Sequence, residues 1–176
     1  GCAYTSARVR TLAAAGAPLF AQCYGRFEVR ARAPLGRGLW SAVWLLPAAD
    51  TYGAWPASGE IDLMEIVGDR PQEYLGSLHF GAPFPERSHV THAHGLPPGG
   101  GVQEFHVYGL EWEPGEIRWL CDGDVWATQR DWFSGRSSRA DRHAWPAPFD
   151  QPFHLLVNLA VGGGLPGPPD DSTKFP

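Results

Sequence analysis

Short segments in which apolar and polar side chains alternate recur along this 176-residue chain, and they restrict its fold more than any other feature. In the clearest segment, residues 153–161, every second side chain is a large apolar group. Alternation with a period of two is the pattern of a strand that packs one face on a core. The same pattern predicts further strands at residues 24–32, 39–46, 59–67, 75–80, 105–112, 117–121 and 125–129.

Turn signals separate these segments. Asp122-Gly123 and Pro114-Gly115 predict hairpins, and the 22 glycines and 17 prolines of the chain favour a turn-rich protein. Helical periodicity is weak, and residues 134–143 are expected to form a loop with at most one turn of helix. Two stretches are predicted to be loops from their composition, residues 81–101 and 162–171. The sequence therefore predicts one all-β domain over residues 1–176, with two antiparallel sheets packed face to face.

The charge and cysteine content exclude several classes of partner. The net charge is −5, Lys174 is the only lysine and the arginines are scattered, so no nucleic-acid partner is expected. No apolar run approaches the length that spans a membrane, so no membrane partner is expected either. The three cysteines, Cys2, Cys23 and Cys121, permit one disulfide at most, and free buried thiols agree equally well with their number.

Three carboxylates lie on the apolar segment Glu60–Glu65, although acidic residues are depleted in strands. Glu60 and Asp62 share a strand face, whereas Glu65 would point to the other face of a regular strand. One extra residue near Leu63-Met64, a β-bulge, would return Glu65 to the face of Glu60, and bulges concentrate beside active sites. Two working carboxyl groups about 5–5.5 Å apart are typical of a retaining glycosidase. We therefore predict Glu60, Asp62 and Glu65 as catalytic residues.

Two other interpretations of the carboxylates remain open. One is an exposed strand face that carries three acids without a function. The other is a site for calcium or another hard metal ion, because oxygen ligands also cluster in such sites. The composition does not decide between them, and a catalytic site is favoured because it explains both the spacing and the apolar neighbours.

Aromatic residues near this segment are candidates for sugar binding, because sugars present flat apolar C–H faces. Trp55 stands in the loop that leads directly onto the strand of the carboxylates, although it also fits a residue at the edge of the core. Trp40 and Trp44 share one face of strand 39–46, and core packing is the alternative for each of them. Core packing is the main expectation for three other tryptophans, Trp112, Trp119 and Trp126.

Polar side chains on neighbouring segments complete the candidate site. His79 lies on the strand after the carboxylates and is expected to contact a glutamate or a substrate hydroxyl, a structural histidine being the alternative. Asn158 lies opposite the apolar stripe of strand 153–161, where it either faces the cleft or serves as a structural amide. His89, His92 and His94 superficially suggest a metal site, but no cysteine or carboxylate lies nearby to complete it. We therefore predict no metal site.

At this point the chain resembles a known family. Residues 55–68 (WPASGEIDLMEIVG) resemble the signature of glycoside hydrolase family sixteen, in its laminarinase-like branch. Further blocks resemble the same family in the same order, at residues 24–28, 38–44, 105–112 and 152–163. The resemblance covers nearly the whole chain.

The resemblance implies a β-jelly-roll sandwich that hydrolyses β-glucan with retention of configuration. Glu60 would be the nucleophile, Glu65 the acid/base, and Asp62 would assist between them. The two residues between Asp62 and Glu65 are typical of laminarinases, which favours β-1,3-glucan. The branch also includes enzymes that act on mixed-linkage glucan and on galactans such as agar. A non-hydrolytic β-glucan-binding protein on the same sandwich is the alternative, although such relatives typically lack one or both glutamates.

The resemblance also concerns the ends, the cofactors and the location of the protein. The first and last strands of the family's sandwich, with the calcium site that they commonly supply, are expected to be missing from this chain. No cofactor is expected for the reaction. We expect a monomer that acts outside the cell or in the periplasm, because a polymeric substrate cannot enter a cell.

Overall fold

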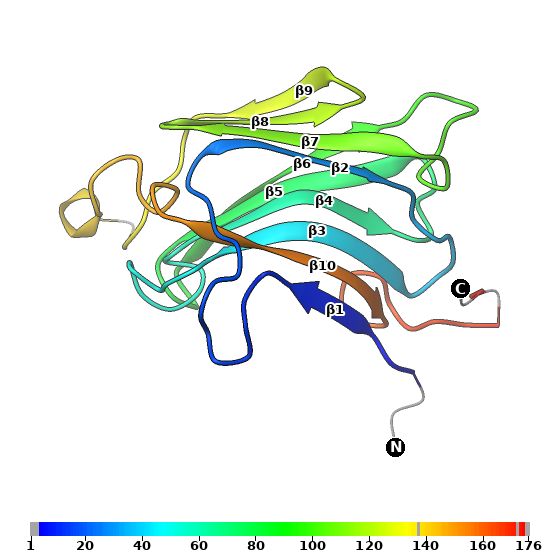
Figure 1. Ribbon diagram of the computed structural model, residues 1–176, viewed down its shortest axis with the longest axis horizontal. Coiled ribbons are helices and arrows are strands. Elements are labelled where there is room, and N and C mark those ends of the chain that lie inside the picture. Colours follow the sequence, from blue (N-terminus) through cyan, green and yellow to red (C-terminus); the bar gives the residue numbers. More distant parts are fainter. Residues whose placement is uncertain (1–3, 137, 172, 175–176) are drawn as a thin grey trace.

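The computed structural model describes residues 4–136, 138–171 and 173–174. In these residues two antiparallel β-sheets pack face to face (Figure 1). The larger sheet has six strands in the order β1 (Ala7–Arg10), β10 (Phe153–Val161), β3 (Leu39–Pro47), β4 (Glu60–Val67), β5 (Glu73–Gly81) and β6 (Arg87–Gly95). The smaller has four, in the order β2 (Gly25–Ala31), β7 (His106–Glu113), β8 (Glu116–Cys121) and β9 (Asp124–Gln129). This jelly-roll sandwich confirms the predicted all-β fold.

The strands predicted from alternation all form, with ends within two residues of the expected ones. Residues 162–171 lack strand and helix, and the short 3-10 turn Arg139–Asp141 is the single helical turn expected in its segment. Both hairpins form as predicted, since Glu113 pairs with Glu116 and Cys121 with Asp124. Asp122 and Gly123 have φ angles of 52° and 96°, the left-handed conformation that a tight two-residue hairpin turn requires.

The prediction of a loop over residues 81–101 was wrong, because β6 lies within it. Its inward-facing side chains are Ser88, Val90, His92 and His94, so the strand lacks the large aliphatic stripe on which the prediction depended. The rings of His92 and His94 pack instead on Trp119 and Trp126, at centroid distances of 5.5 and 4.9 Å. The strand β1 was not predicted either, because four residues are too few to show a period.

Aromatic side chains dominate the core between the sheets. Trp112 and Trp119 are fully buried there, as expected. Trp126 is half-buried and packs its ring 5.2 Å from that of Tyr74. The largest fully buried side chains are Trp112, Trp119, Tyr74, Tyr108, Phe149, Phe153, Leu39, Leu45, Ile61, Leu63, Ile66 and Leu78.

The structure also bears on the state of the cysteines and on membrane-spanning helices. Cys23 and Cys121 are free thiols, and Cys2 lies outside the described residues. Among the residues that the structure describes, no helix is long and apolar enough to cross a membrane.

Candidate active site

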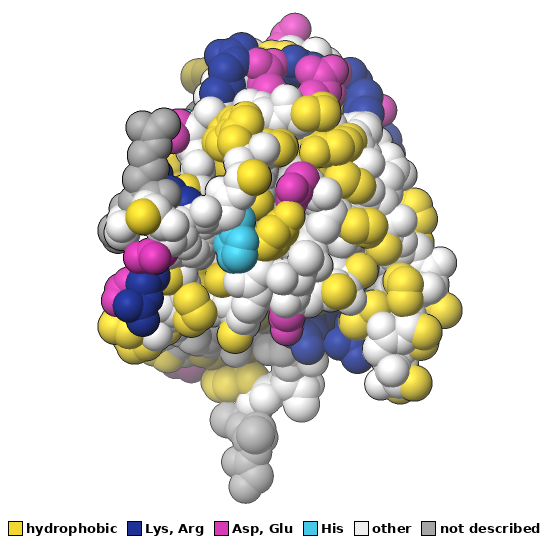
Figure 2. Space-filling view, turned by 90° about the vertical axis from the view of Figure 1, so that its left-hand side faces the viewer, with side chains coloured by type: hydrophobic (Ala, Val, Ile, Leu, Met, Phe, Trp, Pro, Cys, Tyr) yellow, Lys and Arg dark blue, Asp and Glu magenta, His cyan; other side chains and the backbone are white. Residues whose placement is uncertain are grey.

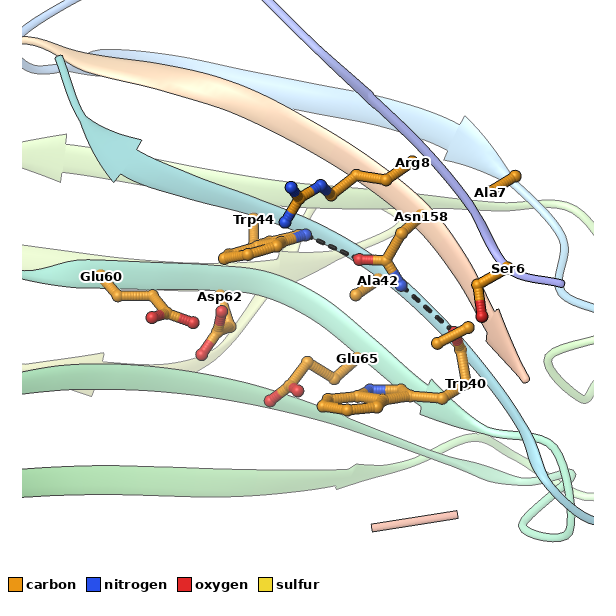
Figure 3. A pocket seen from close by; sticks show the side chains of 11 residues that line it. Ser6, Ala7, Arg8, Trp40, Ala42, Trp44, Glu60, Asp62, Glu65 and Asn158 are labelled. Atoms are coloured by element: carbon orange, nitrogen blue, oxygen red, sulfur yellow. Dashed lines mark hydrogen bonds between the residues drawn. The ribbon is translucent and has the colours of Figure 1, made fainter. Parts of the chain in front are cut away.

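The strand β4 contains the predicted β-bulge. Its pairing with β5 shifts register between Asp62 and Glu65, and its pairing with β3 shifts so that Met64 pairs with Val43 and Asp62 with Trp44. Leu63 is therefore the extra residue. Leu63 and Met64 both point into the core, with 1% and 3% of their surface exposed. The bulge returns Glu65 to the face of Glu60 and Asp62, and all three side chains point into one hollow (Figure 3).

A tryptophan from the opposite sheet holds the backbone at this bulge. The indole Nε1 of Trp119, on β8, donates a hydrogen bond of 2.9 Å to the carbonyl oxygen of Asp62. Gly76 on β5 makes room for the indole, because a Cβ atom at this position would lie 2.4 Å from Trp119 Nε1. A bulge leaves a backbone group without its ladder partner, and a buried carbonyl without a partner is unfavourable. Trp119 thus stabilises the conformation that brings the carboxylates together.

Each carboxylate has a different set of partners. Glu60 accepts a short hydrogen bond from the indole N–H of Trp55. Asp62 is almost fully buried, and its Oδ2 atom lies 3.2 Å from Nε2 of His79. Glu65 accepts a hydrogen bond of 3.1 Å from the hydroxyl of Ser77, which itself lies 3.0 Å from the hydroxyl of Thr91. The three acids therefore differ in burial and in the donors that stabilise their ionised forms.

Burial raises the pKa of all three carboxyl groups. For Glu60 burial and the neighbouring Asp62 charge raise the pKa to about 8, although His79 and the Trp55 N–H lower it. Burial, followed by the charge of Glu65, raises the pKa of Asp62 well above its usual value. Burial also raises the pKa of Glu65, against the hydrogen bond from Ser77 and the charge of His79. Because these groups interact, they lose their protons in coupled steps, and the cluster keeps protons up to neutral pH.

The hollow above the carboxylates combines acids with aromatic walls. It has a volume of about 400 Å³, and its lining includes Trp40, Trp44, Asn158 and Arg8 besides the three acids (Figure 3). A second hollow of about 320 Å³ continues from it, because both include Trp44 and Glu60. The second hollow is lined by Trp44, Leu46, Pro47, Asp50, Trp55, Ser58, Gly59, Glu60 and His154. Together the two hollows form one cleft, with Trp44 and Glu60 where they meet.

The predicted binding residues all lie on this cleft or at its edge. Trp40 and Trp44 are half-buried on the cleft face of β3, so they line the cleft and are not core residues. Trp55 is 41% exposed, and its ring centroid lies 5.9 Å from that of His79. His79 sits on β5 directly opposite Glu60, as expected for an adjacent strand. Their roles in substrate binding remain predictions.

Asn158 has both of the functions that the sequence left open. It lines the cleft, but its Oδ1 atom accepts a hydrogen bond of 2.8 Å from the indole of Trp44 and its Nδ2 atom donates one of 3.3 Å to the carbonyl of Trp40. The amide thus fixes the orientation of one aromatic wall of the cleft (Figure 3).

Sequence reasoning missed several polar residues of the site. Ser77 shares a strand face with His79 at a spacing of two, a signal that could have placed it beside Glu65. Thr91 and His89 lie on β6, within the segment predicted to be a loop, and the His89 ring stacks on that of His79 at 5.7 Å. Arg8 lies on β1, where no strand was expected.

The histidine motif of β6 does not form a metal site. His89 points to the cleft face of the sheet, whereas His92 and His94 point to the opposite face, toward Trp119 and Trp126. In the described residues two other groups have potential ligand atoms within 4.8 Å of one another: Glu60 with Asp62 and His79, and His106 with Cys121 and Asp122. In the second group Asp122 already accepts hydrogen bonds from His106 Nδ1 and from the backbone N–H of Val107, at 2.7 and 2.8 Å.

Comparison with known proteins gives one consistent result. A beta-glucanase from Rhodothermus marinus is 43% identical over 178 residues, which cover 95% of this chain and 56% of the relative. A glucan endo-1,3-beta-glucosidase from Cryptopygus antarcticus is 40% identical over 167 residues, which cover 93% and 57%. The laminarinase catalytic domain from Thermotoga maritima superposes with a TM-score of 0.73 at 32% identity, over 89% of this chain and 60% of that one. The chain thus spans between half and two thirds of the length of these proteins.

The match extends to the family level. Residues 6–167, which include the whole cleft strand β4 and both glutamates, match the profile of the glycosyl hydrolases family 16. Together with the sandwich fold and the carboxylates on the bulged strand, this match shows that the chain belongs to glycosyl hydrolases family 16.

Proposed function

We propose that this chain forms the catalytic site of a retaining glycoside hydrolase that cleaves internal β-1,3-glucosidic bonds of a laminarin-type β-glucan. The observation that carries the proposal is the β-bulge at Leu63, which brings Glu60 and Glu65 onto the same face of β4 inside an aromatic cleft. Two carboxyl groups on one face, one ionised and one protonated, are the requirement for glycoside hydrolysis with retention.

In the first step Glu60 attacks the anomeric carbon, and the glycosidic C–O bond breaks as Glu65 gives its proton to the leaving oxygen. A glycosyl ester on Glu60 results. In the second step Glu65 takes a proton from water, and the oxygen of that water displaces Glu60 from the anomeric carbon. The sugar leaves with its original configuration, and both glutamates return to their starting states.

Asp62 has the task of holding a proton that would otherwise neutralise Glu60. Asp62 lines the same hollow as Glu60 and is the more deeply buried of the two. Burial favours the neutral form of Asp62, and a neutral Asp62 no longer adds the charge that raises the pKa of Glu60. The indole N–H of Trp55 favours the ionised form of Glu60. Glu60 is thereby ready to attack although its own pKa is raised.

The proposed specificity for β-1,3-glucan rests on two observations. It comes from the names of the relatives and from the two residues that separate Asp62 from Glu65. Mixed-linkage glucan and galactans remain alternative substrates within the same family. We also propose that the protein acts as a monomer outside the cell or in the periplasm, where its polymeric substrate is found. The two-carboxylate mechanism needs no cofactor.

The test is chemical rescue. Glu60→Ala is expected to abolish the release of reducing ends from laminarin, because no nucleophile remains. Azide should restore part of the activity on a substrate with an activated leaving group, since it fits the space of the removed carboxylate. Full activity of Glu60→Ala without azide would exclude Glu60 as the nucleophile.

A second candidate function is binding of β-glucan without cleavage. The presence of both glutamates and Asp62 in one cleft argues against it. Retardation in a laminarin-containing gel without release of reducing ends would favour this alternative. If reducing ends are released, product profiles on laminarin, lichenan and agarose would identify the linkage that the cleft accepts.

A further inference from the structure

A third hollow, separate from the two that form the cleft, has aromatic side chains in its lining. It has a volume of about 460 Å³ and is lined by Asp131, Trp132, Phe133, Arg142, His143, Trp145 and Ala147. None of these residues lines the two hollows of the cleft. Figure 2 looks onto this end of the molecule, where hydrophobic side chains lie exposed near acidic side chains and a histidine.

Trp145 forms a rigid aromatic platform in this hollow. Its ring stacks on that of Trp132, with centroids 4.7 Å apart and planes inclined by 25°. Trp132 is buried and is fixed by a hydrogen bond of 2.9 Å from its indole to the carbonyl of Pro146. Trp145 is nevertheless 52% exposed, so one ring face rests on Trp132 while much of the remaining ring surface is open. An exposed tryptophan that is already immobilised loses little further entropy when a ligand covers it.

The edge of the hollow is polar. Asp131, Arg142 and His143 are exposed side chains that offer hydrogen-bond donors and acceptors around the aromatic floor. The guanidinium of Arg142 lies over the ring of Phe133, 4.0 Å from its centroid, which restricts its orientation. A flat apolar floor with polar groups at its edge matches a sugar, which has apolar C–H faces and a rim of hydroxyl groups. It does not match a purely apolar partner, because these polar groups would then be buried without partners.

The same loop borders this hollow and the cleft. Tyr52, in the loop between β3 and β4, packs its ring 4.8 Å from that of His143. Its backbone N–H donates a hydrogen bond of 2.9 Å to Ser58, which lines the cleft, and Trp55 of the same loop contacts Glu60. A polymer chain that leaves the cleft at this end, or a neighbouring chain of the same polymer, therefore lies close to the third hollow.

We propose that the hollow around Trp145 is an accessory carbohydrate-binding site for β-glucan, separate from the catalytic cleft. The identity of the sugar rests on the function proposed above, whereas the site itself rests on the stacked tryptophans and their polar surroundings. Such a site would hold the enzyme on a polymer and would raise the local concentration of substrate at the cleft.

The direct test is a titration followed by nuclear magnetic resonance of the tryptophan indole N–H groups. The protein carries Glu60→Gln so that the probe, a laminarin-derived hexasaccharide, is not consumed. The signal of Trp145 is identified by its loss in Trp145→Phe, and the signal of Trp55 in the same way. We expect both signals to shift, each with its own dissociation constant.

The outcomes separate this proposal from the proposed function. If only the Trp55 signal shifts, the accessory site is refuted and the cleft is supported. If only the Trp145 signal shifts, the accessory site is supported and β-1,3-glucan is excluded as the ligand of the cleft. If neither shifts, both proposals fail for this sugar.

A second measurement uses the insoluble polymer. Trp145→Ala is expected to weaken binding to insoluble β-1,3-glucan about tenfold, the change that corresponds to ~1.4 kcal/mol of lost contact. The matched control is Phe105→Ala, which removes an aromatic ring that is 49% exposed and lies outside both sites. The control should bind as the unchanged protein does. Equal binding by Trp145→Ala and Phe105→Ala would contradict the proposal.

Discussion

Trp119 and Trp112 offer a matched pair of substitutions that isolates the function of the bulge. Both indoles are fully buried, both lie in the four-stranded sheet, and each donates one hydrogen bond to a backbone carbonyl. Trp119 donates to Asp62 at the bulge, whereas Trp112 donates to Phe149, at 3.1 Å, away from the carboxylates. Replacing either with Phe leaves a buried carbonyl without its donor, which costs about 1–3 kcal/mol of the free energy of unfolding, and the lost ring volume adds to that cost.

Activity should separate the two variants. Without the Trp119 hydrogen bond the backbone at Asp62 can relax, and a displacement of about 1 Å at the reacting groups costs about a hundredfold in rate. We therefore expect Trp119→Phe to lower kcat on laminarin by about 10- to 100-fold with a smaller change in KM. Trp112→Phe, although similarly destabilised, should keep its kcat to within about twofold.

The free energy of unfolding is measured in urea, and kcat is measured from reducing ends at a temperature where both variants are folded. A Trp119→Phe variant with the same kcat as Trp112→Phe would refute the argument that this indole positions the carboxylates. A loss of kcat in both variants would refute it as well, because it would show that destabilisation alone impairs the site.

Four further predictions follow from the site. Trp55→Phe removes the donor that favours ionised Glu60, so the pKa of Glu60 should rise and the acidic limb of the pH–rate profile should move to higher pH; an unmoved limb would contradict the hydrogen bond. The pKa of Glu60 is raised from 4.5 to about 8 in the folded state, so between these pH values the folded protein binds more protons than the unfolded chain. The free energy of unfolding should therefore fall as the pH rises from about 5 to about 8. Glu60→Gln should show a smaller fall in melting temperature over that range, and an identical fall would exclude Glu60 as a source of it. Gly76→Ala forces a Cβ atom onto the Trp119 indole and should lower the free energy of unfolding by about 1–3 kcal/mol, unlike Gly95→Ala, which has no atom within 4 Å of the added Cβ. EDTA should leave the hydrolysis of laminarin unchanged, and a loss restored by calcium would show a dependence on metal.

Sequence patterns predicted the strands that carry large apolar side chains, and they failed where other residues replaced them. In β6 the inward positions include His92 and His94, which pack on tryptophan rings from the opposite sheet. A histidine counts as a polar residue in an alternation pattern, although its imidazole ring can pack in the core as an aromatic group. The partners of such a ring lie far away in the chain, so no local pattern reveals them.

The bulge was predictable because it follows from the number of positions between the two glutamates of β4. Glu60 and Glu65 differ by an odd number of positions, and only an extra residue brings them to one face of a strand. The hydrogen bond from Trp119 to Asp62 was not predictable, since the two residues are 57 positions apart in the sequence. The sequence thus showed that β4 had to depart from regular geometry, whereas the group that stabilises the departure became visible only in the fold.

The inward direction of both Leu63 and Met64 has a consequence for shortening the chain. If Leu63 or Met64 were deleted, the strand would alternate without interruption. The three acids would then lie two positions apart, all on the cleft face. The three carboxylates would stay on one face after the loss of a whole residue, while the core would lose one apolar side chain and the indole of Trp119 would lose its present hydrogen-bond acceptor geometry. The length of β4 can therefore change by one residue while its acids stay on one face, provided that the packing of the facing sheet adjusts to the new spacing.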